Sequence, residues 1–196
     1  EGVVNCWGSN EYAVVGPIAS AWVGDDETWF EAPRLTFPSP VTSVSTGYYS
    51  ACALTAAQTV YCWGGAYYGI LGLGTASSEN YVGNDEEPSS VGPVNMGGSV
   101  LRVSVGYYHA CAVLTTNLVK CWGSGSDGKL GYRNVNDIGV TNTPADVGTV
   151  RTGGTVTLIS TGRDWSCAVL TVGSVRCWGL NDIGQLGLGH TRTIGD

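Results

Sequence analysis

Cysteines are the residues of this sequence whose type and spacing most clearly indicate chemistry. Six of the seven fall into three pairs whose members are ten positions apart: Cys52 and Cys62, Cys111 and Cys121, Cys167 and Cys177. Paired thiols either bind a metal or form a disulfide. Structural zinc sites combine two closely spaced pairs into four convergent ligands, and pairs ten apart without a histidine pair nearby fit that pattern badly. The spacing therefore favours disulfides over zinc.

A β-hairpin explains why a spacing of ten suits a disulfide. A hairpin centred on Ala57 places Cys52 and Cys62 directly opposite each other, and hairpins centred on Thr116 and Val172 do the same for the other two pairs. Opposed residues in a non-hydrogen-bonded pair have Cα atoms about 4.5 Å apart, within the reach of a disulfide. We predict three disulfides, each stabilising the fold by roughly 2 to 3 kcal/mol.

Cys6 has no partner at this spacing, because the position ten residues earlier precedes residue 1. One interpretation is a free thiol or an intermolecular bridge. The other is a pair whose second member lies outside this sequence. We favour the second, because it also accounts for strands that are missing from the start of the first unit.

His109 is the histidine with the clearest context, two positions before Cys111. Ser50 and Trp165 hold the same position before Cys52 and Cys167. A catalytic base would not alternate with serine and tryptophan, so we expect a structural role for His109. The sequence contains no nucleophile elbow, phosphate-binding loop or paired-carboxylate arrangement, and we expect a protein that is not an enzyme and has no cofactor.

Acidic loops such as residues 25–27 and 85–87 contain oxygen ligands that calcium could use. Their spacing does not follow the alternating pattern of calcium-binding loops, so we expect solvated carboxylates and no metal site.

Aromatic residues form the remaining candidate site. They are three tyrosine pairs and two tryptophans of an irregular segment: Tyr48, Tyr49, Tyr67, Tyr68, Tyr107, Tyr108, Trp22 and Trp29. Exposed tyrosine and tryptophan are favoured in protein interfaces and as platforms on which sugars stack. Packing between repeats is the alternative for the tyrosines.

The elements that must position these residues follow from an internal repeat. The tripeptide Cys-Trp-Gly begins at Cys6, Cys62, Cys121 and Cys177, in steps of 56, 59 and 56 residues. We expect units of about 1–40 (partial), 41–99, 100–155 and 156–196 (partial). Short β-branched or aromatic runs bounded by glycine predict strands and little or no helix. Neighbours on a strand point to opposite faces, so the disulfide and the indole should contact different neighbouring sheets.

Composition excludes two classes of partner. Nine basic against sixteen acidic residues give a net charge of −7, and only 13% of residues are charged. Nucleic-acid binding requires a basic surface that neutralises phosphates, and none is present. No apolar run reaches the roughly 18 residues of a membrane helix, so we expect no membrane insertion.

Three segments resemble the regulator of chromosome condensation repeat: residues 106–113, 119–123 and 181–189. The resemblance implies an all-β fold, a β-propeller of four-stranded antiparallel blades, usually seven, of which residues 1–196 would form about three and a half. The same fold group includes the secreted beta-lactamase-inhibitor protein II. The founding member is a nucleotide-exchange factor for a small GTPase, but it is not organised around paired blade cysteines, and no exchange residue carries over.

Disulfides persist in oxidising compartments, which favours a secreted or cell-surface protein. We expect a structural or adhesive interaction module of an extracellular assembly or filament, with other extracellular proteins, glycans or further copies of itself as partners. A soluble inhibitor-like propeller that binds a protein or glycan is the alternative. A nucleotide-exchange factor is a third, disfavoured hypothesis.

Overall fold

The computed structural model of the chain describes residues 3–18, 20, 22–25, 28, 31, 32, 34–75 and 81–196. The fold is all-β, as the repeat predicts. Within these residues the only helices are three single-turn 3-10 helices: η1 (Tyr67–Gly69), η2 (Ser126–Gly128) and η3 (Pro144–Asp146). Nothing helical in the described part of the chain is long and apolar enough to cross a bilayer.

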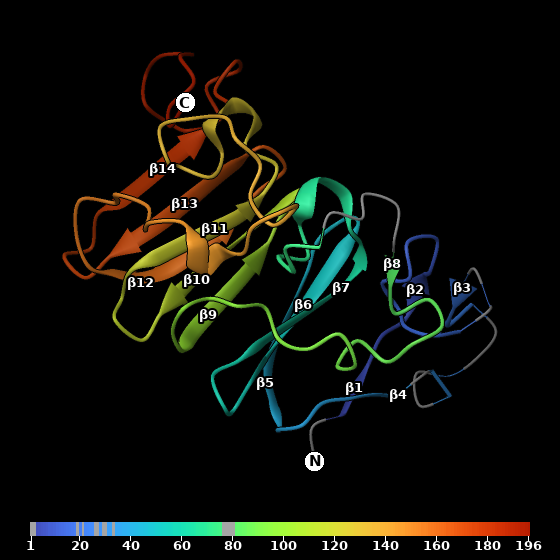
Figure 1. The fold of residues 1–196 in the computed structure, drawn as a ribbon. Helices are drawn as coiled ribbons and strands as arrows, with labels where there is room; N and C mark the ends of the chain where they lie inside the picture. The colour runs from blue at the N-terminus through green and yellow to red at the C-terminus, as the bar shows by residue number, and fades with distance from the viewer. Residues whose placement is uncertain are drawn as a thin grey trace.

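Each of the three later units forms an antiparallel sheet. The second unit contributes four strands in the order of the sequence: β5 (Val41–Thr46), β6 (Ser50–Thr55), β7 (Val60–Gly65) and β8 (Tyr81–Val82). The third contributes β9 (Val100–Val105), β10 (His109–Leu114) and β11 (Val119–Gly123). The fourth contributes β12 (Val156–Thr161), β13 (Trp165–Leu170) and β14 (Val175–Gly179). Figure 1 shows the three sheets side by side.

Within the described residues a four-stranded sheet occurs only in the second unit, so the expectation of four-stranded blades holds fully for one sheet. In the third and fourth units isolated bridges, such as Gly123 with Ile138 and Gly179 with Ile194, take the place of a fourth strand. The Nζ of Lys120 fastens the outer segment of the third unit by donating to the carbonyls of Pro144 and Val147, both at 2.6 Å. Glycine, asparagine and proline are frequent in this segment, and they weaken strand ladders.

The first unit departs further from the blade pattern. Its described strands form two small sheets, one of β1 (Val3–Asn5) with β4 (Arg34–Thr36) and one of β2 (Gly8–Ser9) with β3 (Trp22–Val23). Figure 1 shows this unit beside β7 and β8. The number of blades in a closed ring and the unit boundaries remain predictions.

The hairpins place the paired cysteines opposite each other. Cys52 faces Cys62, and the other two pairs have the same register. All three disulfides are formed, with Cα atoms 4.0 to 4.1 Å apart. Cys6 forms no disulfide with any described cysteine, and a partner outside this sequence stays a prediction. The turns close with a left-handed residue at Gln58, Asn117 and Gly173, each of which donates its N–H to the carbonyl three positions earlier.

Neighbouring sheets approach closely at the glycines that precede each second strand. A Cβ on Gly47 would overlap the carbonyl oxygen of Gly106, and a Cβ on Gly106 would overlap that of Gly162. Any side chain at these two positions would force the sheets apart. The repeated glycine is therefore a packing requirement of the stack.

The two faces of the third unit's sheet contact different neighbours, as the alternation predicts. The Trp122 Nε1 donates to the carbonyl of Ile70 in the preceding unit at 2.7 Å, whereas the Cys111 Sγ lies 3.7 Å from the Ser166 Oγ of the following unit. The core is the series of apolar layers between sheets, where Trp63 and Trp122 are fully buried.

Candidate functional site

Six tyrosines predicted as interface residues come together in space. Together with Tyr12 and Tyr81 they form one network of ring contacts, which we call the tyrosine cluster: Tyr12, Tyr48, Tyr49, Tyr67, Tyr68, Tyr81, Tyr107 and Tyr108. Two of its pairs lie in the turns from β5 to β6 and from β9 to β10, and a third lies in η1. The repeat places these turns at the same end of neighbouring sheets, so tyrosines far apart in sequence meet.

Tyr49 lies at the centre of the cluster. Its ring stacks on Tyr108 with centroids 4.7 Å apart and an interplanar angle of 12°. The edges of Tyr12 and Tyr67 approach it at 4.5 and 5.0 Å. These rings come from three different units, and each edge-to-face or stacked pair contributes about 0.5 to 1.5 kcal/mol beyond its buried area. The cluster therefore also helps to hold the units together.

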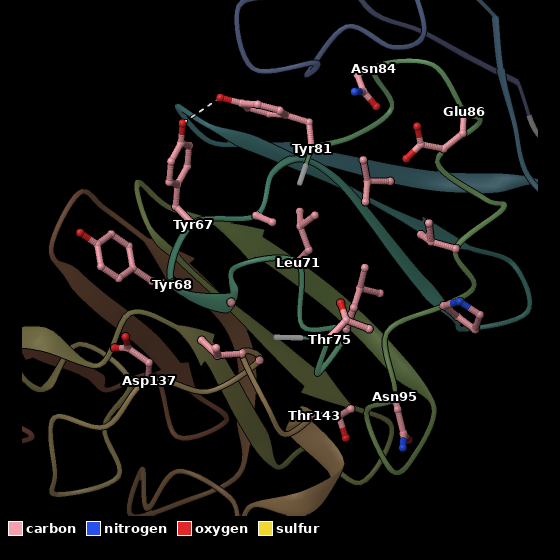
Figure 2. A pocket seen from close by; sticks show the side chains of 18 of the residues that line it. Tyr67, Tyr68, Leu71, Thr75, Tyr81, Asn84, Glu86, Asn95, Asp137 and Thr143 are labelled. Carbon is pink, nitrogen blue, oxygen red and sulfur yellow. Dashed lines mark hydrogen bonds between the residues drawn. The ribbon is translucent and has the colours of Figure 1, made fainter. Parts of the chain in front are cut away.

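Hydroxyl groups inside the cluster bond to one another. Those of Tyr67 and Tyr81 lie 3.0 Å apart, as the dashed line in Figure 2 marks, and those of Tyr49 and Tyr107 lie 3.4 Å apart. The hydrogen bond with Tyr81 and burial together raise the pKa of Tyr67 to about 12, and burial raises the pKa of Tyr12 to about 12. These phenols therefore stay neutral over the physiological range.

Two members of the cluster face solvent. Tyr48 is 59% exposed and Tyr68 is 50% exposed, while the other six are half-buried. The Arg163 guanidinium lies over the Tyr107 ring, 5.1 Å from its centroid. The exposed part of the cluster thus offers aromatic faces and hydroxyl donors, and it packs on the half-buried rings of Tyr49 and Tyr108.

A cavity of about 1150 Å³ adjoins the cluster (Figure 2). Tyr67, Tyr68 and Tyr81 line it together with the carboxylates of Asp85, Glu86 and Asp137. Of the described residues on its walls, none is lysine, arginine or histidine. Burial and the hydrogen bond with Asp85 raise the pKa of Glu86, as expected for a carboxylate without a cationic neighbour.

The two predicted tryptophans have different outcomes. Trp22 lies in β3, is 58% exposed and lines a groove of about 590 Å³ with Trp7 and Tyr48. It therefore adjoins the cluster through Tyr48. Trp29 lies outside the described residues, so its predicted interface role stays a prediction.

His109 has the structural role that the sequence indicates. It is fully buried, and its Nε2 lies 2.9 Å from the Ser166 Oγ, which donates to the carbonyl of Lys129. Burial, with a smaller effect of Lys129, lowers the pKa of His109 to about 3. The described residues include no group of three His, Cys, Asp or Glu side chains that could hold a metal.

Sequence reasoning missed three residues of the site: Tyr12, Tyr81 and Arg163. Tyr12 belongs to the divergent first unit, and Tyr81 follows a variable loop, so no repeat position marked either. Arg163 did carry a signal, because it follows Gly162 as Tyr48 follows Gly47 and Tyr107 follows Gly106. It therefore occupies the tyrosine position of the fourth unit.

The stacked sheets, the disulfides within them and the indole bonds between them define a β-propeller segment. The chain belongs to the regulator of chromosome condensation (RCC1) repeat family, whose repeat models match residues 41–70, 100–129 and 59–113. This confirms the resemblance seen in the sequence.

Solved structures show the same fold. Human WBSCR16 superposes with a TM-score of 0.75 at 20% identity, over 97% of this chain and 50% of that chain. Yeast RCC1 (Prp20), in its structure bound to Kap60, gives a TM-score of 0.73 at 16% identity, over 99% and 43% of the two chains.

Among curated proteins, the human probable E3 ubiquitin-protein ligase HERC4 is 29% identical over 77% of this chain. Human E3 ubiquitin-protein ligase HERC2 is 32% identical over 78%. The chain spans only 13% and 3% of the lengths of these two relatives.

Proposed function

We propose that this protein is a non-catalytic, extracellular β-propeller module that binds other proteins of an assembly through the tyrosine cluster. The observation that carries the proposal is the convergence of eight tyrosines from three units on one site, with Tyr48 and Tyr68 exposed. Tyrosine contributes a large contact area at small entropic cost and is enriched in interfaces.

The three disulfides support an extracellular location. Each links adjacent strands of one sheet, and the two in the second and third units are buried between sheets. Disulfides are rare in reducing compartments. Their repetition in successive units therefore favours secretion or display at the cell surface, in a structural or adhesive role.

A non-catalytic role agrees with the use of the histidine. His109 is buried and hydrogen-bonded to Ser166, with a pKa too low for a general base near neutral pH. The ligases HERC4 and HERC2 share only a small part of their length with this chain. We therefore extend the shared propeller fold to this protein and leave out the ligase activity.

Tyrosine-directed cross-linking of the protein in its native assembly, followed by mass spectrometry, tests the proposal. We expect cross-links to partner chains to concentrate on the turns at residues 47–49, 66–69 and 106–108. Tyr48→Ala should weaken partner binding, whereas Val172→Ala, at an 82% exposed turn position, should not. Partner cross-links confined to other surfaces, with Tyr48→Ala binding as the wild type does, would show that the cluster is not the interface.

A glycan-binding role is a second candidate. The groove formed by Trp7, Trp22 and Tyr48 favours it, because exposed aromatic faces stack on sugar rings. Binding to an oligosaccharide array that Trp22→Ala abolishes and Tyr68→Ala leaves intact would support this role. If no oligosaccharide binds, this candidate is wrong.

A further inference from the structure

We infer that the tyrosine cluster and the acidic cavity beside it bind an arginine-bearing segment of a protein partner. The inference rests on the proposed function and adds the chemistry of the partner. Three observations carry it. The cluster exposes aromatic faces, the described cavity walls hold carboxylates without a basic side chain beside them, and the guanidinium of Arg163 already lies against the same cluster.

The chain contains its own example of the contact. Tyr48, Tyr107 and Arg163 occupy the same position in successive units. The rings of Tyr48 and Tyr107 lie 4.9 Å apart, and the guanidinium of Arg163 lies over the Tyr107 ring, 5.1 Å from its centroid. The negative face of an aromatic ring attracts a cation within about 6 Å of its centroid. A tyrosine face of this cluster therefore accepts a guanidinium.

Charge around the exposed Tyr68 favours the same ligand. Asp137 and Tyr68 both line the cavity, and Figure 2 shows Glu86 on the side away from them. The described wall residues provide no basic side chain to neutralise these carboxylates. The net charge of −7 would also attract a basic segment over longer distances. A volume of about 1150 Å³ is large enough for a short chain segment rather than one side chain.

Arginine fits this site better than lysine. A guanidinium is planar, stacks on an aromatic ring and donates two parallel hydrogen bonds to a carboxylate. An ammonium group is a compact, strongly hydrated charge that cannot make both contacts as well. We therefore expect preference for arginine as well as dependence on charge.

An NMR titration of the full chain tests the inference. The probes are three peptides of the same length that alternate glycine with arginine, lysine or citrulline, the last being the uncharged counterpart of arginine. We expect the arginine peptide to shift the resonances of residues 47–49, 66–69 and 107–108, and to bind more tightly than the lysine peptide. The citrulline peptide should bind at least about tenfold more weakly. Equal binding of the arginine and citrulline peptides would overturn the inference.

Variants locate the contact. Tyr68→Ala should weaken arginine-peptide binding about two- to fivefold, as expected for an exposed cation–π contact, whereas Tyr68→Phe keeps the aromatic face and should stay within twofold. Asp137→Asn removes charge but keeps the oxygen that accepts the N–H of Gly125 at 2.9 Å, and it should also weaken binding. Arginine-peptide binding that is unchanged in both Tyr68→Ala and Asp137→Asn would contradict the inference.

The two proposals fail in different ways. If partner cross-links map to the cluster but the arginine peptide does not bind, the inference of an arginine-bearing partner is wrong, while the proposed interface is supported. If the peptide binds as described but partner cross-links map elsewhere, the proposed interface is wrong.

Discussion

The indole Nε1 of Trp122 donates a hydrogen bond of 2.7 Å to the carbonyl oxygen of Ile70, 52 positions earlier in the chain. The same bond joins Trp63 to Val14 and Trp178 to Lys129, at 2.8 and 2.9 Å. A glycine recurs ten residues after the cysteine of each Cys-Trp-Gly tripeptide, and the three acceptors lie two residues before Gly16, Gly72 and Gly131. Each unit is thereby tied to the one before it.

Removing one of these bonds should destabilise the stack. Trp122→Phe deletes the donor, leaves the buried carbonyl of Ile70 without this partner and creates a void, so we expect a loss of about 2 to 4 kcal/mol in the free energy of unfolding. Trp7, at 64% exposure, provides the control, and Trp7→Phe should cost less than about 0.5 kcal/mol. Urea denaturation measures both. Equal losses would show that the indole bond does not hold the units together.

The pair of His109 and Ser166 predicts opposite effects for two serines. Ser166→Ala leaves the buried Nε2 of His109 without its partner and should cost about 1 to 3 kcal/mol. Ser50 holds the position of His109 in the second unit, and Ala110 holds that of Ser166 in the third. The buried Ser50 Oγ has no hydrogen-bond partner, so Ser50→Ala should be neutral or stabilising. Thermal unfolding of both variants checks this, and a large loss on Ser50→Ala would contradict it.

Much of the architecture was predictable because the same cysteine spacing and strand pattern recur in several units. Three equal cysteine spacings fixed the hairpin register, and alternation along the strand placed Cys62 and Trp63 on opposite faces. The outer strands were less predictable. Lys120 holds its segment by donating to carbonyls at the start and just after the end of η3, and sequence patterns do not reveal such contacts.

The site was predicted only as separate tyrosine pairs. Their convergence depends on how neighbouring sheets are placed, which local patterns do not contain. Tyr12 and Tyr81 join through tertiary contacts from segments outside the repeat pattern. Arg163 could have been found by aligning the units position by position.

Acid should destabilise the protein through His109. Its pKa is about 3 in the folded state and about 6.5 in the unfolded chain. Between these values the unfolded state binds the additional proton, so stability is complete above about pH 6.5 and falls by about 1.4 kcal/mol per pH unit below it. Denaturation at several pH values should show this slope in the wild type relative to His109→Gln. Identical pH dependence in the two proteins would rule out this contribution.

In a protein of residues 1–196, reducing agents should open one disulfide first. Cys167 and Cys177 are half-buried, whereas the other four bridged cysteines are at most 1% exposed. Limited reduction followed by alkylation and mass spectrometry should label Cys167 and Cys177 before the rest. Cys6, which forms no disulfide within residues 1–196, provides the internal reference. Simultaneous labelling of all six bridged cysteines would mean that burial between sheets does not protect the disulfides.

Hydrogen–deuterium exchange on the protein, alone and in its native assembly, tests the central claim most directly. If the tyrosine cluster is the interface, residues 47–49, 66–69 and 106–108 should exchange more slowly in the assembly, while the turn around Val172 should not change. Protection elsewhere, with unchanged exchange at these three turns, would contradict the claim.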